Sequence, residues 1–273
     1  MTDVVARNNV RESGNPTGPP MVFAHGYGCD QAMWRYVAPH FEAEHRVVLF
    51  DHVGFGGSDL GAWSAERYQT LDAYAEDLVE IIEELDLREV IFVGHSVAAM
   101  IGVLASIKVP ERFARLVLVG PSARYVDDPD AGYVGGFSSS DIQELLETLD
   151  ANHLGWSAGM APVIMGNPER PELAAELEAS FCRSDPAVSL AFARATFLSD
   201  NRADLERVST PALILQCRAD AIAGEEVGWY VHEHLRDSDF VTLDASGHCP
   251  NLSAPDETAG AIRTYLDVHA ARR

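Results

Sequence analysis

Short apolar runs alternate with longer amphipathic stretches up to about residue 120, and again after Pro211. The runs are rich in β-branched residues and continuously apolar, which is typical of strands buried on both faces of a parallel sheet. This alternation predicts an α/β fold with a mostly parallel central sheet and helices on both faces. The expected strands are Met21–Ala24, Val47–Asp51, Val90–Val93, Leu116–Val119, Ala212–Gln216 and Phe240–Leu243.

Helices are expected between these strands. The clearest is Leu71–Leu85, where apolar residues recur at three- and four-residue steps and form one stripe. Thr70 precedes this stretch and is a candidate cap for the helix. The helices expected in the alternating parts of the chain are Met33–Phe41, Leu71–Leu85, Val97–Ile107, Val227–Leu235 and Glu257–Ala270.

The alternation stops between Pro121 and about Asp200, where the pattern is helical and broken by Gly and Pro. The expected helices here are Ser139–Leu149, His153–Ile164, Pro171–Phe181 and Ala187–Leu198. We interpret residues 121–200 as a four-helix cap inserted into a core formed by residues 1–120 and 201–273. A small helical layer has to bury its apolar face against the larger domain, and such junctions favour ligand pockets.

The charge of the chain excludes several classes of partner. The formal net charge is −22 and the pI about 4.6, so the surface should repel nucleic acid and anionic lipid. No apolar run approaches the roughly 20 residues of a spanning helix, and the first 16 residues lack a signal-peptide pattern. The four cysteines form no C-x-x-C pair. We expect a cytoplasmic protein with reduced cysteines and no metal or cofactor.

The segment EVIFVGHSVAAM, from Glu89 to Met100, places Ser96 between an apolar run and a helical one. A serine at a sharp strand-to-helix turn is how an α/β-hydrolase presents its nucleophile. A serine before a helix is also a common N-cap without any chemistry. The usual motif G-x-S-x-G has its last glycine replaced by Ala98 here, which we interpret as a tolerated variation.

A serine nucleophile needs a base and an acid, which in this fold follow it in loops after later strands. Asp220 follows the strand Ala212–Gln216, and His248 follows Phe240–Leu243. His248 would take the serine proton, and Asp220 would fix its tautomer. The rival acids are Asp200, Asp204 and Asp244. Of these Asp244 is the strongest, since it lies four residues before the histidine, although it follows a later strand.

The negative charge of a tetrahedral intermediate needs backbone N–H donors. The N–H of Val97 starts the helix after the nucleophile, where amides are unpaired and the helix dipole is positive. A second donor is expected in the loop His25-Gly26-Tyr27-Gly28, for which we select the Tyr27 N–H. A plain glycine-rich turn is the alternative for that loop, but its place after an early strand favours the functional interpretation.

Two other motifs point to scaffolding. The glycines in DHVGFGGSD, residues 51–59, lack the G-x-G-x-x-G spacing of a dinucleotide loop. His232 and His234 lie two apart on an expected helix and face different directions, so a metal site there is disfavoured.

Several blocks of the chain resemble the RsbQ family, bacterial α/β-hydrolases of the sigma-B stress pathway that are similar to plant karrikin and strigolactone receptor hydrolases. The resemblance runs almost end to end, including the insertion, and LILQC-x-x-D and GHCP are its most specific motifs. The matching blocks are Met21–Asp59, Val93–Pro110, Pro121–Tyr125, Phe181–Pro186, Leu213–Asp220 and Ser246–Thr258.

The resemblance implies the triad Ser96, Asp220 and His248, and an oxyanion hole at Tyr27 and Val97. It also implies a narrow apolar pocket under the cap, a small hydrophobic ester, lactone or enol ether as substrate, and a PAS-domain phosphatase as partner. The positions expected to line the pocket are His95, Tyr125, Phe137, Trp156, Met160, Phe192 and Phe197. Met160 departs from the phenylalanine frequent in relatives, and should soften the pocket locally.

Overall fold

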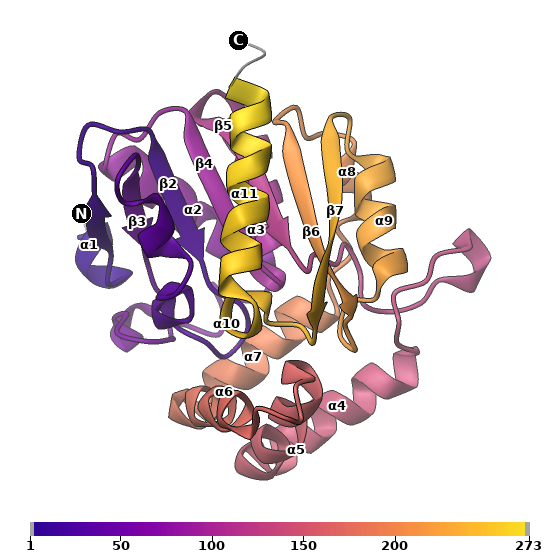
Figure 1. Ribbon diagram of the computed structural model, residues 1–273. Coiled ribbons are helices and arrows are strands. Elements are labelled where there is room, and N and C mark those ends of the chain that lie inside the picture. The colour runs from indigo at the N-terminus through magenta and orange to yellow at the C-terminus, as the bar shows by residue number, and fades with distance from the viewer. Residues whose placement is uncertain (1–2, 271–273) are drawn as a thin grey trace.

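The computed structural model describes residues 3–270, and within them seven strands form one sheet (Figure 1). The strand order is β1-β3-β2-β4-β5-β6-β7, and every neighbouring pair is parallel except β1 with β3. The strands are β1 Arg11–Gly14, β2 Pro20–Ala24, β3 Arg46–Leu49, β4 Val90–His95, β5 Phe113–Val119, β6 Ala212–Ala219 and β7 Ser238–Ser246. The predicted α/β fold with a mostly parallel sheet is confirmed.

Helices cover both faces of this sheet because its central strands are apolar at every position. Along β2, Val22 and Ala24 face one side, whereas Met21 and Phe23 face the other. The first side packs against α2 (Leu71–Glu84), α3 (Val97–Lys108), α8 (Arg202–Leu205) and α9 (Glu225–His234). The second packs against η1 (Gln31–Trp34), η2 (Ala38–Phe41), α10 (Pro250–Ser253) and α11 (Pro255–Ala270). The remaining short helices are α1 Val4–Arg7, η3 Leu60–Ala62, η4 Pro110–Arg112 and η5 Pro129–Ala131.

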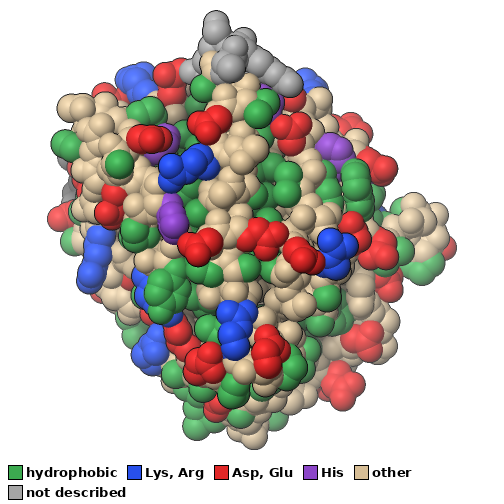
Figure 2. All heavy atoms as spheres, viewed as in Figure 1, with side chains coloured by type: hydrophobic (Ala, Val, Ile, Leu, Met, Phe, Trp, Pro, Cys, Tyr) green, Lys and Arg blue, Asp and Glu red, His purple; other side chains and the backbone are tan. Residues whose placement is uncertain are grey.

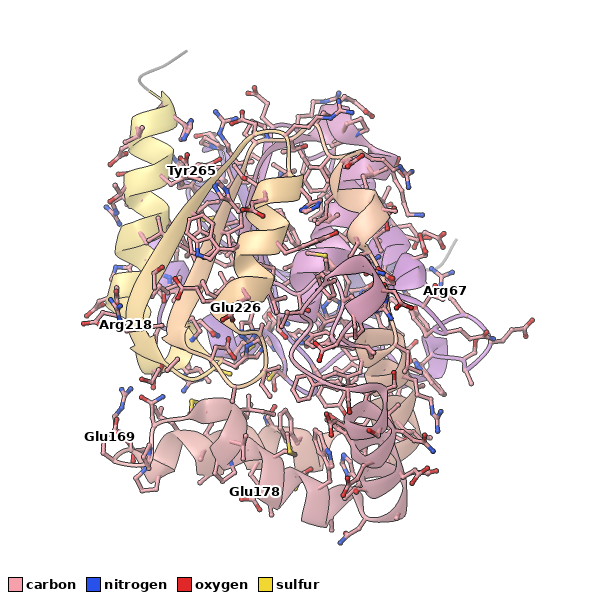
Figure 3. All side chains as sticks on the ribbon, turned by 90° about the vertical axis from the view of Figure 1, so that its right-hand side faces the viewer. Arg67, Glu169, Glu178, Arg218, Glu226 and Tyr265 are labelled. Carbon is pink, nitrogen blue, oxygen red and sulfur yellow. The ribbon has the colours of Figure 1, made fainter. Side chains whose placement is uncertain are left out.

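The four helices expected between residues 121 and 200 lie together below the carboxyl ends of the strands (Figure 1). They are α4 (Ser139–Ala151), α5 (His153–Met165), α6 (Pro171–Arg183) and α7 (Pro186–Phe197), and we call them the helical layer. Figure 3 shows Glu169 and Glu178 in this layer, beneath the strand end that carries Arg218. The layer extends the second core of the sheet, to which it contributes Leu146, Trp156 and Phe181.

Three local expectations differ from the structure. The segment Met33–Phe41 forms the two 3-10 turns η1 and η2 instead of one helix, because Pro39 has no N–H to continue an α-helix. Strand β1 was not predicted, since its sequence RESG is polar and all four residues are exposed. Thr70 occupies the N-cap position of α2, but its side chain makes no capping hydrogen bond.

Acidic side chains are spread over the surface rather than gathered in one patch on the face seen in Figure 2. None of the helices in residues 3–270 combines the length and the apolar character needed to cross a bilayer.

Candidate active site

Ser96 lies on the sharp turn between β4 and α3, at the carboxyl edge of the sheet. Its backbone has φ 57° and ψ −123°, a left-handed conformation that is costly for a residue with a side chain. Ser96 holds the N-cap position of α3, yet its hydroxyl makes no capping hydrogen bond. The Oγ instead lies 2.7 Å from Nε2 of His248. The strained turn therefore directs the hydroxyl away from the helix and toward a base.

The elbow is closely packed, and this explains the residues on either side of Ser96. A Cβ added to Gly94 would lie 2.6 Å from the ring of Phe92 and 2.7 Å from the carbonyl oxygen of Ala98. Only glycine fits this approach of strand and helix. The side chain of Ala98 is fully buried in the core formed with α2 and α3, so its methyl group is accommodated.

His248 is hydrogen bonded to Ser96 on one side and to Asp220 on the other. Nδ1–H donates to Oδ2 of Asp220 over 2.7 Å, which leaves Nε2 to accept from the Ser96 hydroxyl. Both ring and carboxylate are buried, with 4% and 1% of their side chains exposed. The rival acid Asp244 is 85% exposed and pairs with Arg218 instead. The other two rivals, Asp200 and Asp204, pair with nearby arginines.

Asp220 is held as a carboxylate by its neighbours. Burial alone would raise its pKa, but the charge of His248 and the hydrogen bonds that the carboxylate accepts lower it overall. Besides His248, the donors are the backbone N–H groups of Ile222 (2.8 Å) and Ala223 (3.0 Å), which both reach Oδ1. The two oxygens of Asp220 thus have different partners, and the one facing His248 is fixed.

The loop that carries His248 is tied to the helical layer at the corner between α5 and α6. The His248 N–H donates to the Ile164 carbonyl over 2.8 Å. Asn167 Nδ2 donates to the carbonyls of Met165 (2.6 Å) and Ser246 (2.9 Å), so one side chain joins the corner to the loop. The position of the imidazole therefore depends on the helical layer as well as on β7.

The loop of residues 25–28, which is expected to supply one donor of the oxyanion hole, is fixed by a pair of buried histidines. The His52 N–H donates to Nε2 of His25 (3.0 Å), so the His25 proton is on Nδ1, which donates to the Gly26 carbonyl (2.9 Å). In return, Nε2–H of His52 donates to the His25 carbonyl over 3.1 Å. The N–H groups of Tyr27 and Val97 donate to no other atom of residues 3–270. Both amides are therefore available to a ligand.

A family model for the α/β-hydrolase fold matches residues 19–255 of this chain. The chain belongs to the α/β-hydrolase family. It is 39% identical to a probable esterase of Oryza sativa subsp. japonica, over 91% of this chain and 92% of the relative. It is 38% identical to a karrikin insensitive 2 receptor of Petunia hybrida, over 90% and 91%. The predicted likeness to the plant receptor hydrolases is confirmed.

A solved structure of a bacterial hydrolase is similar to this chain along nearly its whole length. A hydrolase from Oleispira antarctica superposes with a TM-score of 0.94 at 41% sequence identity, over 97% of this chain and 96% of that one. The overlay covers the helical layer as well as the sheet, because nearly the whole chain is included.

The α/β-hydrolase has a small, mostly apolar cavity between the helical layer and the Ser96 elbow. Its volume is about 40 Å³, which is room for a few atoms only. Four larger hollows, of about 280 to 570 Å³, lie elsewhere and contain neither Ser96 nor His248. The lining consists of Tyr27, Cys29, His95, Ser96, Tyr125, Trp156, Met160, Ile164, Leu177, Phe181, Thr196, Phe197, Ile222, His248 and Cys249.

Five of the seven positions expected in the pocket line this cavity, whereas Phe137 and Phe192 do not. The ring of Phe192 is buried in the core and contacts Tyr74 at 4.5 Å between centroids. Phe137 lies just before α4, where its backbone bridges to Val126. The rotation of α7 about its axis, which helical periodicity does not fix, therefore separates Phe192 from Phe197, while Phe137 is held outside the helices.

Sequence reasoning missed seven lining residues: Cys29, Ile164, Leu177, Phe181, Thr196, Ile222 and Cys249. Two are thiols, and burial raises the pKa of Cys29 to about 12 and that of Cys249 well above its usual range. Both thiols therefore stay neutral at physiological pH. Cys29 and Cys249 immediately follow motifs that were recognised, H-G-Y-G and the histidine loop, and this proximity is the signal that could have found them.

No group of three or more His, Cys, Asp or Glu side chains in residues 3–270 is placed to hold a metal ion. His232 and His234 have other partners, the Ser238 hydroxyl and the Tyr230 carbonyl.

His95 is packed against the loop of residues 25–28 in this α/β-hydrolase and is neutral. Its Nε2–H donates to the His248 carbonyl over 2.7 Å, while a Cβ at Gly26 would meet Nδ1 at 2.6 Å. Glycine is therefore required at position 26, and the buried Nδ1 of His95 has no hydrogen-bond partner within residues 3–270. Burial, aided by the charge of His248, lowers the pKa of His95 to about 3.

We expect this shifted pKa to make the protein less stable in mild acid. Below pH 6.5 the unfolded chain binds a proton at His95 that the folded chain excludes until about pH 3, so stability is lost as the pH falls through this window. The loss should reach about 2 kcal/mol at pH 5. In urea unfolding at pH 7 and pH 5, His95→Gln should therefore show a pH dependence smaller by about this amount. An equal pH dependence in both proteins would contradict the prediction.

Proposed function

We propose that this α/β-hydrolase is a serine hydrolase that cleaves small hydrophobic esters or lactones, including those that also carry an enol ether, through an acyl-enzyme. The observation that carries the proposal is the chain of two 2.7 Å hydrogen bonds from Ser96 through His248 to Asp220. A buried, aligned chain of this kind gives the serine a base and gives the base a fixed tautomer.

In the first step, Nε2 of His248 accepts the proton of Ser96 as Oγ attacks the carbonyl carbon of the substrate. The imidazolium that forms is stabilised by the Asp220 carboxylate, whose low pKa keeps it charged. The imidazolium then gives its proton to the departing alkoxide or enolate oxygen, which leaves an acyl ester on Ser96. Water enters, loses a proton to His248 and releases the acid, and Ser96 recovers its proton.

The oxyanion of both tetrahedral intermediates would be held by the Tyr27 and Val97 N–H groups. The Val97 amide is at the N-terminus of the 12-residue helix α3, where the helix dipole adds to its partial positive charge. The Tyr27 amide is placed by the His25–His52 pair, which fixes the backbone immediately before it. Preorganised donors of this kind need no rearrangement when the charge develops.

The apolar cavity supports small hydrophobic substrates, and we propose that the helical layer acts as a cap that selects them. The cavity is far smaller than the roughly 300 Å³ at which drug-sized ligand sites begin. A panel of p-nitrophenyl esters and simple lactones of graded length tests the proposal. Saturable hydrolysis that declines as the acyl chain lengthens is the expected result, and the absence of hydrolysis across the panel would contradict it.

His52→Phe should lower kcat about tenfold and leave KM within about twofold. The ring would still pack between Phe50 and Tyr74, but the hydrogen bond to the His25 carbonyl would be lost and the Tyr27 amide would be less well aimed. The effect should stay below the 10²–10³ typical of deleting an oxyanion donor outright.

Steady-state kinetics with p-nitrophenyl acetate would measure this effect. His232→Phe, on the remote helix α9, is the matched control and should leave both constants unchanged. An unaltered kcat in His52→Phe would show that this histidine does not position the loop.

A second candidate function is ligand sensing with slow turnover, in which a ligand alters binding to a protein partner such as a PAS-domain phosphatase. Similarity to a karrikin insensitive 2 receptor favours it, as does the attachment of the His248 loop to α5. Turnover far below the enzyme median of about 10 per second, together with a ligand-dependent change in thermal stability, would support sensing. Fast hydrolysis without such a change would support a metabolic esterase.

A further inference from the structure

Thr196 presents a hydroxyl group that has no partner although it is buried at the cavity. The residue lies on α7, is 1% exposed and lines the same cavity as Ser96 and His248. Its Oγ1 forms no hydrogen bond within residues 3–270. A buried hydroxyl without a partner is costly, so such groups in folded proteins usually have one.

Four other helical hydroxyls within residues 3–270 are satisfied by a carbonyl close by in the sequence, whereas Ser180 on α6 donates to the Gly28 carbonyl and Ser253 on the short helix α10 has no partner. The hydroxyls of Ser106, Ser157, Thr258 and Thr264 each donate to a carbonyl three or four residues earlier, over 2.8–2.9 Å. This local bond is the usual solution for Ser and Thr inside helices. The Thr196 hydroxyl does not make this bond, although Thr196 lies within α7 and lines the cavity beside Phe197. Its hydroxyl is therefore left for a molecule inside the cavity.

Trp156 adds a second unsatisfied donor to the same cavity. Its side chain is 4% exposed, and the indole N–H has no acceptor in residues 3–270. The ring is held edge-on against Tyr27 (5.8 Å between centroids, 80°) and tilted against Phe181 (5.7 Å). An indole N–H can only donate. Its partner must therefore be an acceptor.

The other lining groups do not use these donors. Ser96 and His248 are bonded to each other, the thiols of Cys29 and Cys249 are neutral, and the remaining residues are mostly aliphatic or aromatic. Besides Nδ1 of His95, an acceptor that is also buried without a partner, the cavity has two separate polar requirements. One is the carbonyl that Ser96 attacks, and the other is an oxygen to satisfy Thr196 and Trp156.

We propose that the substrate carries a second oxygen, remote from the scissile carbonyl, that accepts hydrogen bonds from the Thr196 hydroxyl and the Trp156 N–H. This inference rests on the proposed hydrolase function and narrows its substrate class. The class is small esters or lactones with an additional ketone, ether or ring oxygen. A site built around buried donors discriminates strongly against analogues that lack the matching acceptor, whereas a purely apolar site does not.

Two pairs of p-nitrophenyl esters test the inference. In the first pair, methoxyacetate has an ether oxygen where butanoate has a CH₂ group. In the second pair, 4-oxopentanoate has a ketone where pentanoate has a CH₂ group. The quantity to compare is the ratio of kcat/KM within a pair, in wild type and in Thr196→Val. Intrinsic differences in ester reactivity cancel in this comparison, because every protein faces the same substrates.

In wild type, kcat/KM for the oxygenated member of at least one pair should exceed that for its partner. Thr196→Val should reduce this ratio of the two kcat/KM values about tenfold. Thr196→Ser should retain the ratio, and Trp156→Phe should reduce it. Met160→Leu, an apolar change in the same lining, should alter kcat/KM for both members of a pair by the same factor and so leave their ratio unchanged. Thr196→Val should also melt no lower than wild type, since it deletes a buried hydroxyl that has no partner.

Equal ratios in wild type and Thr196→Val for both pairs would overturn the inference while leaving the hydrolase function intact. So would a clear fall in melting temperature in Thr196→Val, which would mean that the hydroxyl is already bonded in the free protein. Loss of the hydrolase function is a separate result, seen as no hydrolysis of any ester by wild type. In that case, binding of methyl 4-oxopentanoate and methyl pentanoate, followed by tryptophan fluorescence, still tests the second oxygen, and equal affinities would overturn it.

Discussion

Ser96→Ala is expected to abolish hydrolysis of p-nitrophenyl acetate, with kcat lower by at least about 10⁴-fold and the fold intact. The hydroxyl is the atom that would attack, and it forms no capping bond that α3 would lose on its removal. The Ser96 backbone is already in a left-handed conformation that alanine tolerates as well as serine. The release of nitrophenolate, followed by stopped-flow or in the steady state, measures the activity. Circular dichroism and thermal unfolding show whether the fold is intact.

Ser106→Ala is the matched control for this variant. Ser106 is on the same helix, is 1% exposed, and its hydroxyl donates to the Val103 carbonyl over 2.8 Å. Its removal should cost about 1 kcal/mol of stability and leave kcat within twofold. Retention of most of the activity in Ser96→Ala would exclude the serine mechanism.

Asp220→Asn should lower kcat by about 10⁴-fold, the size of effect that follows when a catalytic histidine is held in the wrong tautomer. The hydrogen bonds of Asp220 explain why. Its Oδ1 accepts from the Ile222 and Ala223 amides, so the asparagine carbonyl oxygen would take that place and its NH₂ would face His248. Nδ1 would then have to accept, which moves the proton to Nε2, and the base could no longer take a proton from Ser96.

Asp244→Asn is the control that separates the two candidate acids. Asp244 is mostly exposed and pairs with Arg218 over 3.1 Å, so its neutralisation should change kcat less than twofold. The rate of nitrophenolate release from p-nitrophenyl acetate, measured with both variants at the same pH, decides which of the two aspartates is the acid. If Asp244→Asn were the more damaging change, the acid would have been assigned to the wrong loop.

The placement of Ser96, Asp220 and His248 was predictable because parallel strands end at a common edge. Residues that directly follow β4, β6 and β7 in the sequence must meet there, whatever lies between them. The lining of the cavity was less predictable, since it depends on how each helix of the helical layer is rotated. On α7, Phe192 therefore packs in the core while Phe197, five residues later and on a different face of the helix, reaches the cavity.

The role of His52 was also hidden in the sequence. The residue stands in a glycine-rich segment, where nothing in the local pattern indicates a contact with His25, 27 positions earlier. The contact arises because β2 and β3 are neighbours in the sheet, so the loops after them lie side by side. The sequence pattern indicates where the strands lie along the chain, but it does not indicate their order in the sheet.

The helical layer leaves and rejoins the sheet through adjacent strands, β5 and β6, which pair from Leu116 with Ala212 to Val119 with Leu215. The Gly120 N–H even donates to the Leu215 carbonyl over 2.8 Å, so the two ends of the excursion are clamped together independently of its helices. Helices from a relative could therefore be exchanged into this segment without altering strand register, since closing a longer or shorter loop changes the free energy only slowly with length. A chimera of this kind would keep its chemistry while acquiring a new selectivity. Besides an apolar face that packs on the sheet, it requires a corner that still holds the His248 loop as Ile164 and Asn167 do.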